Sequence, residues 1–198
     1  MENTIVLLDA GFLSKLSKHF GVNKYLKYDI IKFSRGLAIK QNLFCKHIFY
    51  YTAPPFQSEK PSEEESNRYK NYEKFIKQLR KNQIISIREG RCQRLKIDGK
   101  FIYQQKAVDS FVVMDLMSCP IKYPEIKKVI LVATDSDFVP IIKQLNDFNI
   151  ETILYTYYEK GRTAKFSTSN DLIKTVSKYV LLSKKDFDNA PLEKQGKI

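Results

Sequence analysis

The sequence predicts an α/β domain with a mostly parallel central sheet flanked by helices. Short apolar runs rich in β-branched residues alternate with segments of helical periodicity, which is typical of parallel strands joined by right-handed crossovers. Only the turn Asp98-Gly99 joins two β-prone runs directly, so a small inserted or edge β-hairpin is expected there. With 198 residues, the chain has the length of a single domain.

The first strand is expected over residues 4–8, an apolar run that ends at Asp9. The pair Ala10-Gly11 permits a tight turn into a helix that begins near Phe12. The later strands of the sheet are expected over residues 47–52, 129–134, 151–157 and 179–182.

The clearest helix is expected over residues 62–81, where Ser62 and Glu65 match a capping box. The other helices after the first are expected over residues 29–41, 108–117, 138–147 and 170–177. Pro120 is expected to end the helix that begins at residue 108. Residues 1–182 are therefore expected to form the domain, and the charged residues 183–198 to form a frayed tail.

The charge is strongly basic, with 34 Lys and Arg against 22 Asp and Glu, which gives a net charge of +12. Such an excess favours a polyanionic partner, above all nucleic acid. The alternative is a lysine-rich surface without a partner.

Cysteine and histidine residues argue against a disulfide framework and against a zinc site. Cys45, Cys92 and Cys119 form no CxxC pair, and the only histidines are His19 and His47. No secretion signal and no run as long as a membrane span is present, so the sequence predicts a cytoplasmic protein.

Carboxylates stand where strands end or helices begin. Asp9 follows the first strand, Asp135 and Asp137 follow the strand at 129–134, and Asp109 stands where a helix begins. Each Asp alone is usually a helix N-cap. Because parallel strands direct their carboxyl ends to one edge, Asp9 and Asp135 are expected to converge, and adjacent carboxylates repel unless a cation lies between them.

Three segments resemble the motifs of NYN-domain proteins, which belong to the PIN-like nuclease superfamily, and the LabA-like bacterial branch in particular. The segments are VLLDAGFL, KAVDSFVVMDL and VATDSDFVPIIKQL. The resemblance implies a Rossmann-like, PIN-like sheet, one or two Mg²⁺ or Mn²⁺ ions, and hydrolysis of phosphodiester bonds, usually in RNA. By motif match, the catalytic and metal-binding positions are Asp9, Asp109, Asp135 and Asp137.

Asp115 is a fifth candidate ligand. It lies six residues after Asp109, which is about 120° around a helix, so the two do not share a face. Its alternatives are a role in supporting the ligands and a plain place on the helix surface.

The chain departs from the family pattern at several positions. Phe12 and Leu13 stand near the place of a common Asn, and Ala107 and Thr134 replace Gly in the second and third motifs. Ser177 stands where an Asp is expected. These departures leave the acidic residues in place but bear on substrate positioning and on efficiency.

Substrate contacts are expected from basic and hydroxyl side chains. Lys106 precedes Asp109 by three residues and could contact the scissile phosphate, with a solvated lysine as the alternative. Ser136 could touch a phosphate or cap the next helix. An arginine cluster on the expected hairpin suits phosphate geometry, and its members are Arg88, Arg91 and Arg94.

The sequence therefore predicts a metal-dependent ribonuclease, most simply an endonuclease, that acts on single-stranded or structured RNA. One alternative is a non-catalytic or weakly active RNA-binding regulatory module. Another is a metal-dependent DNA nuclease or phosphatase on the same fold. The sequence leaves open whether the protein forms a homodimer.

Overall fold

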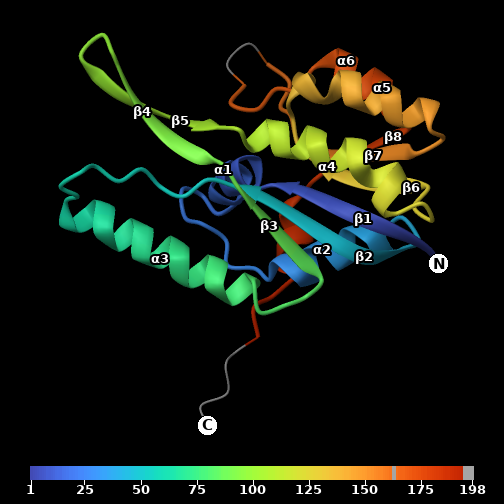
Figure 1. The fold of residues 1–198 in the computed structure, drawn as a ribbon, viewed down its shortest axis with the longest axis horizontal. Helices are drawn as coiled ribbons and strands as arrows, with labels where there is room; N and C mark the ends of the chain where they lie inside the picture. The colour runs from blue at the N-terminus through green and yellow to red at the C-terminus, as the bar shows by residue number, and fades with distance from the viewer. Residues whose placement is uncertain (162–163, 194–198) are drawn as a thin grey trace.

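The computed structural model describes residues 1–161 and 164–193 and contains a six-stranded sheet in which every pairing is parallel (Figure 1). The strand order is β3-β2-β1-β6-β7-β8. These strands are β1 (Glu2–Asp9), β2 (Leu43–Thr52), β3 (Ile85–Glu89), β6 (Lys128–Val132), β7 (Glu151–Thr156) and β8 (Lys178–Leu181). The predicted α/β fold is confirmed.

Helices cover both faces of the sheet (Figure 1). The helices are α1 (Ala10–Phe20), α2 (Ile30–Ile39), α3 (Glu63–Leu79), α4 (Val108–Lys122), α5 (Val139–Asp147), α6 (Asn170–Thr175) and α7 (Lys184–Asp188), with the 3-10 turn η1 (Ser136–Phe138) before α5. Helices α1, α2 and α7 share one apolar core with the sheet, and α4, α5 and α6 share the other.

β1 lies in the middle of the sheet and contributes to both cores. Val6 and Leu8 pack with α1 and α2, while Ile5 and Leu7 pack with α4 and α5. All four side chains have no exposed surface, as the period-two alternation of a strand requires when both faces are covered. The carboxyl end of β1 is therefore fixed in a rigid environment, and Asp9 is its last residue.

The predicted hairpin is present as a separate two-stranded sheet, β4 (Arg91–Ile97) and β5 (Lys100–Lys106). Asp98 and Gly99 have φ angles of 49° and 76°, the two positive values that a tight hairpin turn requires. The hairpin projects away from the central sheet (Figure 1).

Two predictions, one about the end of a helix and one about the C-terminal tail, are wrong. Pro120 does not end α4, which runs two residues further to Lys122, because a proline in the last turn removes only one backbone bond. Residues 183–193 are not a frayed tail: α7 forms there, and Phe187 and Ala190 are buried. Residues 194–198 of the predicted tail lie outside the described residues.

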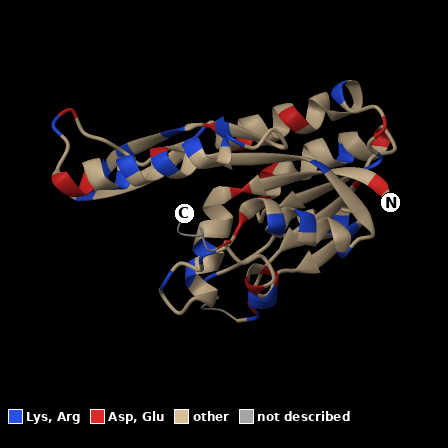
Figure 2. Cartoon of the chain, turned by 90° about the horizontal axis from the view of Figure 1, so that it is seen from below, with Lys and Arg blue, Asp and Glu red and all other residues tan. Residues whose placement is uncertain are grey.

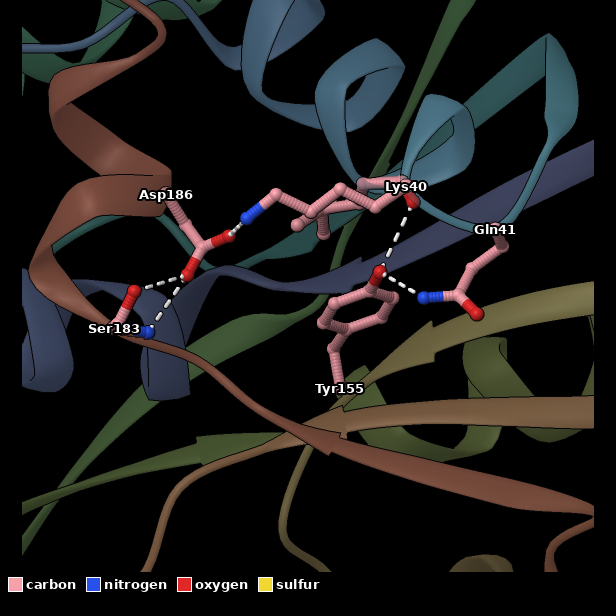
Figure 3. A network of polar contacts seen from close by, with 6 residues as sticks. Lys40, Gln41, Tyr155, Ser183 and Asp186 are labelled. Carbon is pink, nitrogen blue, oxygen red and sulfur yellow. Dashed lines mark hydrogen bonds and ion pairs between the residues drawn. The ribbon is translucent and has the colours of Figure 1, made fainter.

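A polar network holds α7 against α2 (Figure 3). The carboxylate of Asp186 is paired with the ammonium of Lys40 and accepts hydrogen bonds from the hydroxyl and backbone N–H of Ser183, at 2.7 and 2.8 Å. Gln41 donates to the Tyr155 hydroxyl at 2.6 Å, which ties the end of α2 to β7. Burial alone would raise the pKa of Asp186, but the bonds from Lys40 and Ser183 outweigh it and lower that pKa.

We expect Asp186→Asn to lower the free energy of unfolding at pH 7 by roughly 1–2 kcal/mol, a modest value because Lys40 is half exposed. A lowered pKa stabilises the fold above the pKa of an unfolded Asp, about 4, and this stabilisation is lost as pH falls through the lower folded value. Urea unfolding of the wild-type and Asp186→Asn proteins at pH 7 and at pH 3 measures their difference in free energy of unfolding. The difference between the two proteins should shrink at pH 3, and a pH-independent difference would contradict this assignment.

None of the helices in the described part of the chain is both long and apolar enough to cross a membrane.

Candidate active site

A cleft of about 760 Å³ opens at the carboxyl ends of the two central strands, β1 and β6. The chain leaves β1 into α1 on one face of the sheet and leaves β6 through η1 into α5 on the other face. Such a reversal creates a crevice in which α/β proteins bind ligands. Asp9, Asp109 and Asp135 line this cleft. The structure therefore places Asp9 and Asp135 close together, as the sequence predicts.

Asp9 and Asp135 are both helix caps and each uses one carboxylate oxygen for that purpose. Oδ1 of Asp9 accepts from the backbone N–H groups of Gly11 and Phe12, at 2.8 and 3.1 Å. Oδ1 of Asp135 accepts from the backbone N–H of Asp137 at 2.9 Å. Among the described residues, neither Oδ2 atom has a hydrogen-bond donor, so capping occupies only half of each carboxylate.

Asp109 is not a cap. It is the second residue of α4, and the position before that helix is Ala107, whose side chain makes no capping bond. The exposed Asp109 carboxylate lies in the first turn of α4, where it serves as no N-cap, and it lines the cleft. Asp137 lies beside the cleft on η1 and is exposed, with its backbone N–H bonded to Asp135.

Ala107 has φ 68° and ψ −1°, the left-handed conformation that glycine adopts without strain. This gives a physical reason for the Gly that the resembling family has at this position. The strained residue lies at the junction where β5 turns into α4, two residues before Asp109.

Ala107→Gly is expected to raise the free energy of unfolding by about 0.5–1 kcal/mol, because it relieves left-handed strain at an exposed position. The matched control is Ala38→Gly inside α2, which should lower it by about 1 kcal/mol or more. Chemical denaturation of the three proteins gives both values. A destabilising Ala107→Gly would show that the strain is not relieved by glycine.

The acids influence one another electrostatically. Burial raises the pKa of Asp9, the backbone bonds from Phe12 and Gly11 oppose this, and the charge of Asp109 adds to the rise. Partial desolvation at the cleft also raises the pKa of Asp109, and the charges of Asp135 and Asp137 raise it further. Desolvation is the main cause of both shifts, repulsion between the carboxylates adds to each, and a cation at the cleft would relieve this repulsion.

The carboxylates do not form a ready-made metal cage. Within residues 1–161 and 164–193, no three His, Cys, Asp or Glu side chains are close enough together to hold an ion directly. Mg²⁺ does not need such a cage, because it keeps several waters and binds through one or two carboxylates plus substrate phosphates. An all-oxygen donor set with unused Oδ2 atoms fits a hydrated Mg²⁺ or Mn²⁺ ion.

Asp115 and Arg88 bind each other. Asp115 is buried, and its two oxygens accept from Nε and Nη2 of Arg88, both at 2.8 Å, while the Tyr51 hydroxyl donates to it at 3.2 Å. Arg88 lies on β3 of the central sheet, so its predicted place on the hairpin is wrong. This pair gives both residues a structural role, and neither lines the cleft.

The predicted substrate contacts lie outside the cleft. Ser136 is exposed on η1, and Asp135 rather than Ser136 supplies the cap there. Arg91 and Lys106 face each other at the base of the hairpin. Arg94 lies between two aromatic rings, 4.6 Å from the centroid of Phe56 and 4.5 Å from that of Phe101. In Figure 2, Lys and Arg residues occur at several positions of helix α3, which projects on the same side of the molecule as the hairpin.

Sequence reasoning missed the second wall of the cleft. Lys15, Lys18 and His19 of α1 line it, together with Gln105 at the end of β5 and Lys165 in the segment after β7. A Cβ on Gly11 would approach Oδ1 of Asp9 to 3.1 Å and Oε1 of Gln105 to 3.3 Å. The end of the hairpin therefore packs closely on the acidic corner of the cleft, which is formed by Asp9, Asp109 and Asp135. The helical spacing of Phe12, Lys15 and His19 could have indicated a common face.

Comparison with known proteins agrees with this geometry. The model of the NYN domain family matches residues 13–183, which is most of the chain. The chain belongs to the NYN domain family. Asp109, Asp135 and Asp137 of this NYN domain lie within the matched range, and Asp9 lies four residues before it.

A crystal structure of a protein of unknown function from Vibrio parahaemolyticus shares the fold of this NYN domain. The TM-score is 0.57 at 17% sequence identity, and the match covers 94% of this chain and 96% of that one. No curated protein matches the sequence significantly. The structural likeness therefore shows a common fold over nearly the whole length of both chains.

Proposed function

We propose that this NYN domain is a metal-dependent ribonuclease, acting as an endonuclease through the acids at the ends of β1 and β6. The observation that carries the proposal is the meeting of Asp9, Asp109 and Asp135 in one cleft at the reversal point of the sheet. Capping explains one oxygen of Asp9 and one of Asp135, and it does not explain Asp109 at all.

A hydrated Mg²⁺ or Mn²⁺ ion would be held directly by one or two of the carboxylates of Asp9, Asp109, Asp135 and Asp137, and through its waters by the others. When bound, a divalent ion supplies an activated water and neutralises charge that develops on the phosphate. The rigid strand ends and caps would keep Asp9 and Asp135 in place, so little reorganisation is required during reaction. Attack of water with departure of the 3′ oxygen leaves a 5′-phosphate and a 3′-hydroxyl.

The hairpin would position the nucleic acid outside the cleft. Arg91, Arg94 and Lys106 lie on it, and the half-exposed rings of Phe101 and Tyr103 accompany them. Basic side chains interleaved with aromatic rings suit single-stranded RNA. Ser136 is exposed on η1 beside Asp135, where its hydroxyl could reach a phosphate.

The test is incubation of purified protein with an end-labelled single-stranded RNA and its DNA counterpart, in Mn²⁺, in Mg²⁺ and in EDTA. We expect cleavage of RNA in the metal samples and none in EDTA. Product ends should be 5′-phosphate and 3′-hydroxyl, as shown by ligation without prior kinase treatment. Cleavage in EDTA, or 2′,3′-cyclic phosphate ends, would rule out this mechanism.

A second candidate is an RNA-binding regulatory module that turns over poorly. Phe12 and Leu13 stand near the place of the family's usual Asn, and because both side chains are apolar, neither offers a polar group to substrate. Thermal unfolding separates the two candidates when it is combined with the cleavage assay. Stabilisation by Mn²⁺ that Asp135→Asn removes, without cleavage of any nucleic acid, would favour the module.

A further inference from the structure

The cleft has a basic wall in addition to its acidic corner. Lys15 and Lys18 lie on α1 and Lys165 lies between β7 and α6, and all three are exposed and line the cleft. Among the described residues, none of these lysines has a carboxylate within ion-pair distance. Their charges are therefore available to a ligand in the cleft.

The lysines are arranged in order along α1. At 1.5 Å per residue, Lys15 and Lys18 lie roughly 9 and 14 Å further along the helix than Asp9, which caps its first turn. A phosphate chain that begins at the acids would meet one positive charge and then the next along α1.

Aromatic side chains lie at the same end of the cleft. The rings of His19 and Phe166 both line it, and their centroids are 5.1 Å apart in an edge-to-face arrangement. Nε2 of His19 lies 3.3 Å from Oε1 of Glu159 and 3.4 Å from the Tyr157 hydroxyl. These contacts fix the His19 ring, so the pair is a preformed platform with partly exposed surface.

We propose that this end of the cleft is a nucleotide-binding subsite for an unpaired strand, in which Lys15, Lys18 and Lys165 bind phosphates and the His19–Phe166 pair stacks a base. This rests on the proposed function, which supplies the scissile phosphate at the acids. A base can stack on a protein ring only when it is free of its partner strand. The subsite therefore selects single-stranded substrate with little regard to sequence.

The phosphate contacts are tested by binding without cleavage. Fluorescence anisotropy of a labelled single-stranded RNA would be measured against salt concentration, in EDTA, with the Asp135→Asn protein as the starting point. Adding Lys15→Gln and Lys18→Gln should weaken binding about tenfold and reduce the slope of log affinity against log salt by about 1.4, or about 0.7 for each phosphate that a lysine no longer neutralises. Lys122→Gln with Lys143→Gln is the matched control, since both are exposed on other helices and outside the cleft.

The stacking contact has a different signature. Phe166→Leu keeps an apolar side chain but removes the ring, so it should weaken single-strand binding about fivefold or more while leaving the salt slope unchanged. His19→Gln is the second variant, and the melting temperature of each reports whether it folds. A duplex of the same sequence should compete poorly, and equal competition would overturn selection for an unpaired base.

Failure of the subsite and failure of the nuclease proposal are distinguishable. If the wild-type protein cuts RNA but the lysine variants keep the salt slope of their starting protein, the subsite is overturned and the nuclease stands. If the slope falls as expected but the wild-type protein never cuts, the nucleotide subsite stands and the nuclease proposal fails.

Discussion

Asp135→Asn is expected to lower the rate of metal-dependent RNA cleavage about a thousandfold or more, which corresponds to about 4 kcal/mol in the activation barrier. The substitution removes one of the charges that would hold the ion at the end of β6. It keeps the fold, because Asn is as good an N-cap as Asp and can accept the bond from the backbone N–H of Asp137.

Single-turnover cleavage of labelled RNA measures this loss. Asp147→Asn is the matched control, because that exposed acid stands at the far end of α5 and its loss should leave the rate unchanged. Equal melting temperatures in EDTA would show that the fold is intact. If Asp135→Asn cut RNA as fast as the wild-type protein, the acid at the end of β6 would have no part in the reaction.

Arg88→Met is expected to lower the free energy of unfolding by about 3 kcal/mol, and Asp115→Asn by a smaller amount, about 1–2 kcal/mol. The two partners differ in exposure: the side chain of Asp115 is 5% exposed and that of Arg88 is 37% exposed. Without Arg88, a buried carboxylate remains with only the Tyr51 hydroxyl as donor, whereas without the charge of Asp115 the guanidinium can turn to water.

Urea unfolding of the two single variants tests the asymmetry. Adding Asp115→Leu to Arg88→Met should recover part of the loss, since an apolar pair replaces an isolated charge. Both single variants should keep their dependence on Mn²⁺ for cleavage, because the Asp115–Arg88 pair does not line the cleft. Loss of metal response in a stably folded Asp115→Asn protein would make Asp115 a metal ligand after all.

The sequence was sufficient to predict the acidic corner, because the rule for parallel strands is local and strict. An Asp at or just after the end of a parallel strand lies at the carboxyl edge of the sheet; Asp9 ends β1, Asp135 follows β6 by three residues, and the two strands prove to be neighbours. The hairpin was equally accessible, since Asp98 and Gly99 tolerate the positive φ angles that the turn requires.

The remaining features depend on contacts that no local pattern encodes. Arg88 and Asp115 stand 27 residues apart and meet only because β3 and α4 pack together. The basic wall depends on which face of α1 borders the cleft and on the path of the segment after β7, which places Lys165 beside that face. For α7 a signal was present, since Ser183 and Asp186 have capping-box spacing and Phe187 is an apolar residue within a charged stretch.

The most direct test of the proposed nuclease is to incubate one end-labelled single-stranded RNA with wild-type protein and with Asp135→Asn, each in Mn²⁺ and in EDTA. We expect discrete products only for wild-type protein in Mn²⁺, with 5′-phosphate ends. Equal cleavage in all samples would reveal a contaminating or metal-independent activity. Intact RNA in every sample, with RNA binding retained, would contradict the nuclease assignment and leave the acids without a catalytic role.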